Sequence, residues 1–574
     1  MILVFGGTTE GRKAVEVLEE GGSLYFYSTK TGEQDITLHH GQRIDGALDA
    51  EAMRTFCGEH DIRLIVDAAH PFASQLHLTI AQVSESLNIP TIRYERIYPD
   101  RDSEITWIDD YSQIPRDIHS LLATTGVQSI SKLKPLEAEG IRIYYRILQR
   151  ESSISLALKQ GASPEQLCYY EDPQAIPVKT EAILLKESGL SGGFPEKVEA
   201  AKSRGMRIIA LKRPETLVFF TIVNGPYGLR RMVEKLLPEF YPLHSGLTTG
   251  TCATAAAVAA AQRLQKNETP EEVPVLLPDG ETIYIPVSYS EEYASVFKDA
   301  GDDPDVTNGL EIRASVKPSE TFEILGDEGV GRFTLPGFDY PPGEAAINKA
   351  PQEMIRQNLE SYGVPLQVTI SVPEGAEIAR RTFNPRLGIE GGISIIGVSG
   401  IVKPFSEEAF IESIRKCMTV AKASGSERVV INSGGKSERF VRALYPTLPQ
   451  QAFVEYGNYI GETLKISHEL NIKNVTLGVM LGKAVKLAQG HLDTHSRKAT
   501  MDKDFIYTML REAGIETDIS DITLARELWE KIPKEKTQVF VRVVISHCET
   551  FCKPLLPEGT LTTLLIDDEG TIYS

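Results

Sequence analysis

The first twelve residues place the strongest constraint on the fold of this chain. They read MILVFGGTTEGR, a short apolar strand that passes directly into a glycine-rich turn and then into a helical pattern. Glycines in such a turn let the backbone approach phosphate oxygens, and the following helix presents its N-terminus to them. The sequence therefore predicts a dinucleotide-binding βαβ unit at the start of the mature chain, with a cofactor site that includes Gly6, Gly7, Thr8, Thr9 and Gly11.

The end of the second expected strand bears on the choice of cofactor. About 20 residues beyond the glycine turn, a site for NAD carries an acid that binds the ribose 2′-hydroxyl. This chain has Ser28-Thr29-Lys30 there, and a lysine suits a 2′-phosphate better than a hydroxyl. We therefore expect NADPH in preference to NADH, with Lys30 as a ligand. A tight turn that binds nothing is the alternative.

Short apolar strands alternate with helical patterns up to about residue 240. Strands are expected at 2–5, 23–28, 63–67, 91–94, 141–148, 182–186 and 207–211. Helices are expected at 10–20 and 195–204. A further helix should start after Asp49, its N-cap, and end at residue 59, and another should have Pro71 at its first helical position. This order predicts an α/β fold with two doubly wound, Rossmann-like halves facing a cleft.

A proline-bearing connector at 238–246 marks the boundary between two domains, which we expect at 1–243 and 244–574. Beyond it, the pattern predicts an alanine-rich helix at 254–265 and a hairpin at 275–287 around Pro278-Asp279-Gly280. The α/β alternation returns with helices at 407–423 and 451–466 and strands at 428–432 and 475–480. The second domain is thus expected to contain an α+β subdomain followed by an α/β subdomain.

Charge and cysteine content narrow the functional class. The formal net charge of −19 argues against a nucleic-acid partner, because binding to phosphates needs a basic face. The six cysteines are few and scattered, which is typical of a reducing compartment. No charged-then-apolar leader precedes the first strand, and no apolar run approaches the roughly 18 residues of a membrane span. We expect a cytoplasmic protein with no membrane partner, and the sequence is compatible with a homo-oligomer.

Two glycine-rich segments resemble catalytic or nucleotide-binding motifs of other enzyme classes. The segment 189–193 has the G-x-S-x-G form of a hydrolase nucleophile elbow, but the only later histidine of the first half is His244. A glycine turn that cradles a ligand is the favoured interpretation. Gly434-Gly435-Lys436 resembles the end of a P-loop, but Val430 stands where its first glycine is required, so a nucleoside triphosphatase is excluded.

Acidic, histidine and basic clusters supply further candidates. The acidic cluster consists of Asp299, Asp302, Asp303 and Asp305. It does not fit a calcium loop, because the required glycine and glutamate are missing from their positions. One of these carboxylates remains a candidate acid–base group, and a solvated turn is the default interpretation. His491 and His495 stand four residues apart, and we favour substrate contact over metal binding and expect no metal site. Basic side chains that suit carboxylates are Arg380, Arg381, Arg386, Lys483, Lys486, Arg497 and Lys498.

Five segments of the first half carry a resemblance to a known family: GGTTEG at 6–11, DAAHPFA at 67–73, RYER at 93–96, TTG at 124–126, and KESG at 186–189 with GG at 192–193. Together they resemble the precorrin-6A/cobalt-precorrin-6A reductase family of corrin biosynthesis over most of residues 1 to 240. The resemblance implies reduction of a macrocycle by NAD(P)H. It implies a cofactor site that extends to Thr125 and Gly126, a substrate site at Ser188 and Gly189, and candidate catalytic groups at His70 and Lys186.

The second half carries a stronger resemblance. The matching segments are 248–257, 298–307, 329–334, 346–348, 382–389 with 391–394, and 478–483 with 491–495. They resemble the cobalt-precorrin-5B C1-methyltransferase family from about residue 245 nearly to the end. Where family members often continue Ile-Asn-Pro, this chain has Asn348-Lys349. The resemblance implies methyl transfer from S-adenosylmethionine to C1 of a cobalt-corrinoid ring, whose own carbon is the nucleophile, so the protein mainly aligns the reactants.

The resemblance also implies where the second site lies. S-adenosylmethionine is expected at Gly434, Gly435 and Glu455, near predicted strand ends. The carboxylate-rich substrate is expected at Thr249, Arg386, Lys483 and His495, with Asp299 and His491 as candidate catalytic groups. Cys252 is interpreted as structural, because the reaction needs no covalent nucleophile.

Two other functions remain open at this point. One is a short-chain-type NADPH reductase fused to an unrelated transferase, which is disfavoured because no Tyr-x-x-x-Lys pair is evident in the first half. The other is a non-catalytic dinucleotide sensor, which would leave the glycine-rich segments of the second half unexplained.

Overall fold

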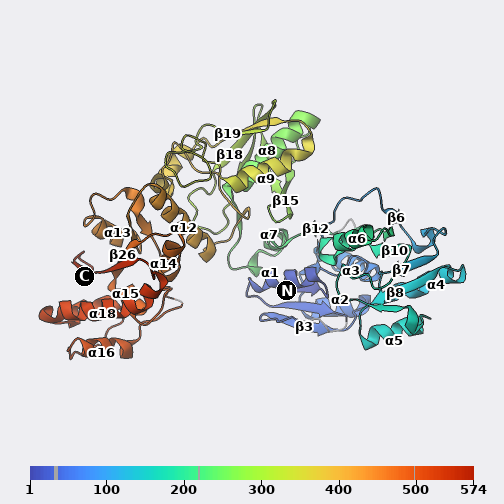
Figure 1. Ribbon diagram of the computed structural model, residues 1–574, viewed down its shortest axis with the longest axis horizontal. Helices are drawn as coiled ribbons and strands as arrows, with labels where there is room; N and C mark the ends of the chain where they lie inside the picture. The colour runs from blue at the N-terminus through green and yellow to red at the C-terminus, as the bar shows by residue number, and fades with distance from the viewer. Residues whose placement is uncertain (31–35, 217–219, 497) are drawn as a thin grey trace. The chain divides into compact units, whose positions relative to one another are not determined.

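The computed structural model describes residues 1–30, 36–216, 220–496 and 498–574. The chain forms two compact units (Figure 1). Unit 1 contains Met1–Ser245 and Pro274–Tyr284, and unit 2 contains Gly246–Val273 and Ile285–Ser574. The α/β class with parallel sheets that we expected for the first half is confirmed.

Unit 1 contains two six-stranded sheets in which neighbouring strands pair in parallel throughout. The first has the order β12 (Thr221–Val223), β5 (Thr91–Tyr94), β4 (Leu64–Asp67), β1 (Ile2–Phe5), β2 (Tyr25–Thr29), β3 (Gly41–Asp45). The second has the order β6 (Thr106–Ile108), β11 (Arg207–Leu211), β10 (Ala182–Lys186), β7 (Ser120–Ala123), β8 (Arg142–Ile147), β9 (Leu167–Tyr169).

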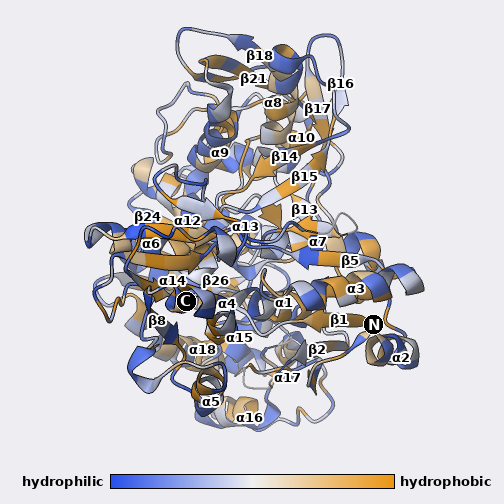
Figure 2. Ribbon diagram, turned by 90° about the vertical axis from the view of Figure 1, so that its right-hand side faces the viewer, coloured by the Kyte–Doolittle hydropathy of each residue, from blue (hydrophilic) through white to orange (hydrophobic). Residues whose placement is uncertain are grey.

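Helices cover both faces of each sheet. On the first sheet, α1 (Thr9–Glu19) and α7 (Pro226–Leu236) pack against the side of Ile2 and Val4, and α2 (Ala50–Glu59) and α3 (Ser74–Leu87) against the side of Leu3. On the second sheet, α4 (Ile130–Ala138) and α5 (Glu151–Lys159) lie on one face and α6 (Phe194–Ser203) on the other. The central strands of both sheets, such as β1 and β4 in the first and β7 and β10 in the second, are predominantly hydrophobic and buried on both faces, whereas the edge strand β3 is largely exposed (Figure 2).

Two predicted helix starts have different outcomes. Asp49 is the N-cap of α2, as expected, and its carboxylate accepts hydrogen bonds from the N–H groups of Glu51 and Ala52. The expectation that Pro71 opens a helix is wrong, because α3 begins at Ser74. The preceding turn is held instead by His70, whose carbonyl accepts from the Ala73 N–H and whose Nδ1 accepts from the Phe72 N–H.

The first part of unit 2 is built around the buried helix α8 (Thr249–Lys266), which packs against β18 (Glu311–Pro318) and α9 (Lys349–Leu359). This helix begins five residues before the predicted start, because the Thr248 hydroxyl caps it by accepting from the Thr251 N–H. The expected hairpin is confirmed as β14 (Glu272–Leu276) and β15 (Thr282–Pro286), of which the stretch Pro274–Tyr284 belongs to unit 1. The mixed sheet has the order β16 (Ser288–Tyr289), β17 (Ala294–Phe297), β18 (Glu311–Pro318), β21 (Leu366–Ser371), β19 (Glu323–Gly326).

Shorter elements complete this part of unit 2. They are β13 (Gly246–Leu247) paired with β23 (Ile401–Val402), β20 (Arg332–Phe333) paired with β22 (Ile389–Glu390), and the helices α9 (Lys349–Leu359), α10 (Gly375–Ile378) and α11 (Asn384–Leu387).

The second part of unit 2 contains a sheet in the order β25 (Phe453–Glu455), β24 (Arg428–Asn432), β26 (Asn474–Met480), β27 (Thr560–Ile566), β28 (Ile572–Tyr573), with only the β27–β28 pairing antiparallel. The helices are α12 (Glu407–Ala423), α13 (Gly435–Arg442), α14 (Ile460–Glu469), α15 (Leu481–Ala488), α16 (Lys503–Glu512), α17 (Leu528–Lys531) and α18 (Thr537–Cys552). The predicted helix at 451–466 is confirmed only from Ile460 onward, where α14 begins. Its first part is wrong, because Phe453 and Val454 are buried in β25.

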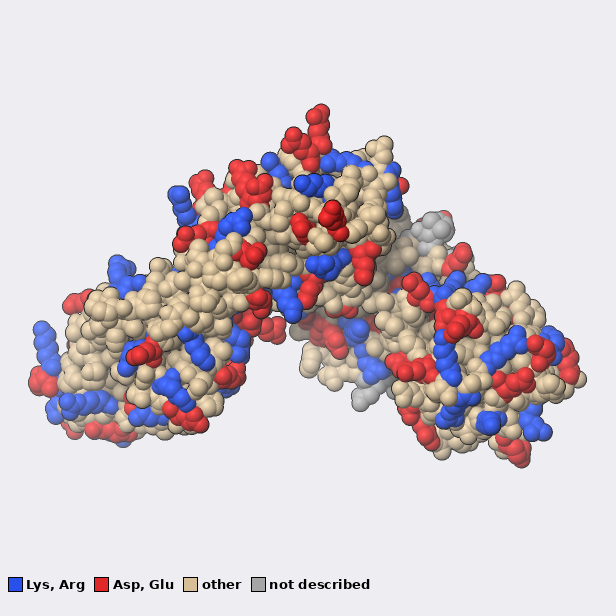
Figure 3. All heavy atoms as spheres, turned by 45° about the horizontal axis from the view of Figure 1, so that its top comes forward, with Lys and Arg blue, Asp and Glu red and all other residues tan. Residues whose placement is uncertain are grey.

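The surface and the helices bear on the expected partners. On the face drawn in Figure 3, acidic and basic side chains are interspersed over both units. Across the described parts of the chain, no helix combines the length and apolar character needed to cross a membrane.

Candidate active sites

In unit 1, the segments that the sequence singled out follow the carboxyl ends of four central strands. The glycine turn follows β1 and residues 68–70 follow β4, while 124–126 follow β7 and 187–189 follow β10. In each sheet these two strands are neighbours, and the strand order runs from them in opposite directions. Parallel sheets bind ligands outside the carboxyl ends of strands at such a reversal. The predicted residues of the first half therefore gather at two positions suited to ligands.

The first glycine turn requires glycine for packing and for conformation. A Cβ on Gly6 would lie 2.1 Å from Tyr27 Oη, and a Cβ on Gly11 would lie 2.8 Å from the Gly6 Cα. Gly7 has a φ of +88°, and nothing lies within 4 Å of its Cβ position. The turn thus brings α1 close to β1 and leaves open space above Gly7, as the approach of a phosphate requires.

The two threonines of this turn have different roles. The Thr8 hydroxyl caps α1 by accepting from the Gly11 N–H at 3.0 Å, and it donates to the Ala68 carbonyl at 2.7 Å. Thr9 is the first residue of α1. Lys30 follows the last residue of β2 and is exposed. Because β2 pairs with β1 in parallel, Lys30 lies at the same edge of the sheet as the glycine turn.

A buried network fixes the loop that carries His70. Asp67 is fully buried, accepts from Arg93 Nη1 at 3.0 Å, and lies 2.6 Å from His77 Nδ1. The other ring nitrogen of His77 lies 3.1 Å from the His70 carbonyl oxygen. Arg93 Nη1 also donates to the Ala69 carbonyl at 2.9 Å. The sequence suggested neither Arg93 nor His77 as functional, and both position the loop.

His70 is a neutral side chain in this setting. Burial, assisted by the positive charges of Arg96 and Lys186, lowers the pKa of His70 to about 3. Its Nδ1 accepts from the Phe72 N–H at 3.2 Å, so the ring proton sits on Nε2. His70 is therefore equipped to donate a hydrogen bond from Nε2 and not to act as a cationic acid.

Lys186 lies close to His70, and the charge of a second lysine, Lys197, also acts on His70. The ammonium of Lys186 lies 4.9 Å from the centroid of the Phe72 ring, and burial lowers its pKa to about 8. Lys197 on α6 donates to the Gly192 carbonyl at 2.7 Å, and burial lowers its pKa to about 8 as well. Arg146 on β8 is 4% exposed. Nothing in their spacing separates Lys197 and Arg146 from ordinary surface cations, so sequence reasoning missed them.

The two glycine turns of the second sheet are held by their own side chains. Gly126 and Gly189 have φ values of +85° and +71°. Thr125 Oγ1 lies 2.6 Å from Ser129 Oγ. The Ser188 hydroxyl donates to the Gly192 carbonyl at 3.2 Å. The G-x-S-x-G segment is thus a glycine turn, as favoured above.

In unit 2, Thr249 acts on a glycine-rich loop. Its hydroxyl accepts from the Ile396 N–H at 2.8 Å and donates to the Ser394 carbonyl at 3.2 Å. The side chain is buried. Thr249 therefore anchors the loop at 391–397 to the start of α8. Its predicted part in substrate binding would be to hold this loop in position.

The acidic cluster surrounds a buried ion pair. Lys298 is 2% exposed, and its ammonium donates to Asp305 Oδ2 at 2.7 Å. Asp299 is exposed, and its Oδ1 accepts from the Gly301 N–H at 2.9 Å. The solvated turn that we expected is present, and the pair of Lys298 with Asp305 was not foreseen.

The residues proposed for the second cofactor gather at the carboxyl edge of the last sheet. β24 leads into Gly434 and α13, β25 ends at Glu455, and β26 leads into α15 with Lys483. β24 and β26 are the neighbours at which the strand order reverses. Gly434 has a φ of +144°, and a Cβ there would lie 3.2 Å from Glu455 Oε1. The space beside Gly435 is open within 4 Å.

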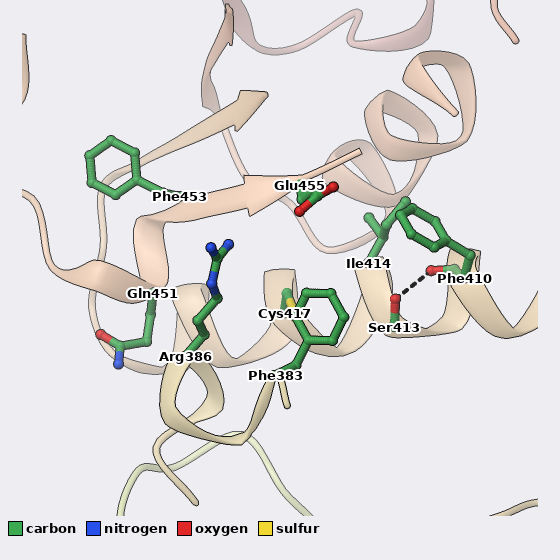
Figure 4. A pocket seen from close by; sticks show the side chains of 9 residues that line it. All are labelled: Phe383, Arg386, Phe410, Ser413, Ile414, Cys417, Gln451, Phe453 and Glu455. Carbon is green, nitrogen blue, oxygen red and sulfur yellow. Dashed lines mark hydrogen bonds between the residues drawn. The ribbon is translucent and has the colours of Figure 1, made fainter. Parts of the chain in front are cut away.

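Glu455 also borders a pocket (Figure 4). The lining residues are Phe383, Arg386, Phe410, Ser413, Ile414, Cys417, Gln451, Phe453 and Glu455. Arg386 points toward β25 and donates to Glu438 Oε2 at 2.8 Å. Burial raises the pKa of Glu455, and in the described structure no hydrogen-bond donor reaches its carboxylate. A half-buried carboxylate without a donor beside two glycines suits the hydroxyl groups of a ribose.

Lys483 and the histidine loop meet the segment after β25. The Lys483 ammonium donates to the Gly457 carbonyl, and burial lowers its pKa to about 8. The Thr494 N–H donates to the Asn458 carbonyl at 3.0 Å, which attaches the loop at 491–495 to the same segment. His491 is exposed and His495 is half-buried.

The remaining expectations for this region concern metals and basic clusters. Within the ranges described, no group of three or more His, Cys, Asp or Glu side chains is arranged to hold a metal ion. Lys498 forms ion pairs with Glu407 and Asp493. Arg497, which we grouped with Lys498, lies outside the described residues.

Two family models match the chain. The model described as precorrin-6x reductase CbiJ/CobK matches residues 1–226. The model described as CbiD matches residues 238–404.

Several curated relatives are similar to the second half, and all carry the name cobalt-precorrin-5B C(1)-methyltransferase. The protein of Prosthecochloris aestuarii is 43% identical over 345 residues, which cover 56% of this chain and 94% of the relative. The protein of Geobacillus sp. is 41% identical over 323 residues, which cover 53% of this chain and 88% of the relative. The protein of Brucella anthropi is 44% identical over 293 residues, covering 49% and 79%.

Two solved structures are similar to the two halves. The cobalamin biosynthesis protein cbiD of Archaeoglobus fulgidus is 30% identical, covers 48% of this chain and 85% of its own length, and gives a TM-score of 0.26. A CobK precorrin-6A reductase is 17% identical, covers 41% of this chain and 97% of its own length, and gives a TM-score of 0.33.

Proposed function

The chain belongs to the cobalt-precorrin-5B C(1)-methyltransferase family and also matches the precorrin-6x reductase family, and from this premise we propose two cofactor sites. It is a bifunctional enzyme of cobalamin biosynthesis that methylates C1 of cobalt-precorrin-5B and reduces cobalt-precorrin-6A. We assign reduction to residues 1–243 and methylation to residues 244–574. The short-chain reductase and the non-catalytic sensor lose their basis, since both halves match families of one pathway.

For the methyltransferase half, we place S-adenosylmethionine at the reversal between β24 and β26. The support is the open space beside Gly435, the left-handed conformation of Gly434 and the Glu455 carboxylate that lacks a donor. A carboxylate at the end of the next strand is the group that binds ribose hydroxyls in doubly wound folds. When bound, S-adenosylmethionine supplies an electrophilic methyl group.

The residues around this site would bind and align the substrate. Arg386 and Lys483 lie beside β25 and offer positive charge to the carboxylates of a corrinoid. Thr249 holds the loop at 391–397, and the three phenylalanines of the pocket exclude water from it. Asp299 and His491 stay as predicted acid–base groups, and His495 as a predicted substrate contact.

For the reductase half, we propose Rossmann-like binding of NADPH at the glycine turn after β1. The support is the open space above Gly7, the N-terminus of α1 at Thr9, and Lys30 at the end of β2. Thr125 and Gly126 stay predicted cofactor contacts on the second sheet. When bound, NADPH supplies a hydride. Lys30 would bind the 2′-phosphate through its positive charge.

The substrate of this half would lie against the loops after β4 and β10. His70 donates a hydrogen bond from Nε2, and Lys186 presents an ammonium whose pKa of about 8 allows it to release a proton near neutral pH. Ser188 and Gly189 form the turn beside them. The observation that carries this placement is the meeting of His70 and Lys186 around Phe72.

An anaerobic assay tests both activities and both sites. The protein is incubated with cobalt-precorrin-5B and S-adenosylmethionine, and separately with cobalt-precorrin-6A and NADPH, and the products are read by mass. We expect one added methyl group in the first reaction and two added hydrogens in the second. The Glu455→Ala variant should lose only methylation, and the Gly7→Ala variant only reduction.

Each outcome has a separate meaning. If a variant keeps its activity and its cofactor affinity, the corresponding site is misplaced although the function stands. If the unaltered, folded protein fails in one reaction, the function assigned to that half is wrong.

A further inference from the structure

A second cavity lies at the carboxyl edge of the last sheet of unit 2. It has a volume of about 260 Å³. Its walls come from the ends of β26 and β27, the start of α15, and the segment 524–529 that leads into α17. The lining residues are Met480, Leu481, Gly482, Leu524, Ala525, Arg526, Trp529, Ile566 and Asp568. This cavity shares no lining residue with the pocket of Figure 4, so the two are separate.

The cavity adjoins the glycine turn proposed for S-adenosylmethionine. β26 ends at Met480 and is the neighbour of β24, which leads into Gly434. Neighbouring strands lie about 4.8 Å apart, so the cavity begins one strand away from the turn. On α13, Lys436 donates to Asp568 Oδ1 at 3.0 Å, which joins the helix after the turn to the cavity wall. Because the Glu455 carboxylate lies beside Gly434, a ligand that begins at Glu455 and crosses the turn reaches this cavity.

The cavity offers a cation, an anion and an apolar wall. Arg526 and Asp568 both line it and are exposed, so their charges stay hydrated until a ligand binds. Trp529 is half-buried, and its ring stacks on that of Tyr573 at a centroid distance of 5.6 Å. Nothing lies within 4 Å of the Cβ position of Gly482, which leaves open space at the first turn of α15.

This set of groups fits a zwitterion with an apolar chain. A carboxylate would bind Arg526 and lie at the N-terminus of α15, which favours negative charge. An ammonium group would bind the second oxygen of Asp568, and methylene groups would pack against Trp529. A carboxylate side chain of the corrinoid would also suit Arg526, but Asp568 would repel it.

We propose that this cavity binds the methionine end of S-adenosylmethionine, with Arg526 on its carboxylate and Asp568 on its ammonium group. The inference rests on the proposed cofactor site at Gly434, Gly435 and Glu455. The size of the cavity agrees with part of a ligand, because pockets for a whole drug-sized ligand have about 300–1,000 Å³. The nucleoside part would lie at the glycine turn and the amino-acid part in the cavity.

The test compares two ligands that differ only at the amino-acid part. S-adenosylhomocysteine and 5′-methylthioadenosine share the nucleoside and the thioether, and only the first carries a carboxylate and an ammonium group. Titration calorimetry measures the Kd of both. We expect Arg526→Met to raise the Kd of S-adenosylhomocysteine by about tenfold, as for one charge-assisted hydrogen bond, and to leave that of 5′-methylthioadenosine unchanged.

Two further variants complete the test. Arg511→Met is the control, because Arg511 lies on α16 and contacts only Tyr507 and Thr508 of its own helix through the hydrogen bonds of its side chain. It should leave both Kd values unchanged. Arg526→Lys keeps the charge and should restore most of the affinity for S-adenosylhomocysteine, which a merely structural role of Arg526 would not predict.

The outcomes separate this inference from the function on which it rests. If the unaltered protein binds both ligands and Arg526→Met changes their Kd values equally or not at all, the methionine end lies elsewhere while the cofactor site stands. If only KM for cobalt-precorrin-5B rises in Arg526→Met, the cavity binds the substrate instead. If the unaltered, folded protein binds neither ligand, the cofactor site itself is overturned.

Discussion

Arg96 joins the two sheets of unit 1 through Glu10. Its Nε lies 2.9 Å from Glu10 Oε2, and its Nη1 donates to the Ser188 carbonyl at 2.8 Å. Ser191 donates to the other oxygen of Glu10. Glu10 belongs to the first turn of α1, beside the proposed cofactor turn, while Ser188 and Ser191 belong to the turn proposed for the substrate. One buried ion pair thus ties the two turns together.

Removal of Arg96 should destabilise unit 1 strongly. Arg96→Met leaves Glu10 buried without its partner, and the loss of one member of a buried pair costs about 3–5 kcal/mol. Urea unfolding followed by circular dichroism measures the change. Arg207→Met is the control, because Arg207 pairs with Asp117 on the surface, where a pair contributes about 0–1 kcal/mol. Equal losses in the two variants would contradict the role of Arg96.

Glu455→Gln should weaken the binding of S-adenosylmethionine. The amide keeps the size of the side chain but removes the charge that accepts the ribose hydroxyls, so we expect Kd to rise by about tenfold. Titration calorimetry measures it. Glu462→Gln, on the exposed side of α14 where Glu462 pairs with Lys465, should leave Kd unchanged. An unchanged Kd in Glu455→Gln would remove Glu455 from the site.

Lys30→Ala should change the preference between the two nicotinamide cofactors. The lysine would contact only the 2′-phosphate, so the Kd of NADPH should rise by about five- to tenfold, while that of NADH stays constant. Lys159→Ala on α5 serves as the surface control. An equal rise in Kd for both cofactors would show that Lys30 does not contact the 2′-phosphate.

The glycine turns could be predicted from the sequence because each depends on local pattern, whereas their ligands stay predictions. The glycine turn after β1 combines a strand, glycines that permit close approach, and a capping threonine within twelve residues. Gly434 and Glu455 were expected near strand ends, and they follow β24 and end β25. Their contact with S-adenosylmethionine stays a prediction. Such local patterns can be recognised without knowledge of the contacts between distant segments.

What the sequence missed depends on contacts between distant segments. The pairs of Arg96 with Glu10 and of Asp67 with Arg93 join residues far apart in the chain, and no rule of residue spacing predicts such pairs. Phe453 and Val454 were expected in a helix, but burial beside β24 places them in a strand. Local propensity gives way where a strand position in a sheet buries more apolar surface.

Lys186 and Lys197 should destabilise the ligand-free protein at neutral pH. Burial lowers both pKa values to about 8, whereas an unfolded lysine titrates near about 10.4. Below pH 8 both states are protonated, and the cost of burying the charge is constant. Between about pH 8 and 10.4 the unfolded state binds more protons, so stability rises with pH.

Lys197→Met should therefore be more stable than the unaltered protein at about pH 7, by about 1–3 kcal/mol. Urea unfolding at a series of pH values measures the difference, which should shrink as the pH rises from 8 toward about 10. The charged neighbours Arg146, Arg96, Lys132 and Glu196 bear on these pKa values, and the arginines keep their charge there. A loss of stability in Lys197→Met at neutral pH would contradict the unfavourable burial of this charge.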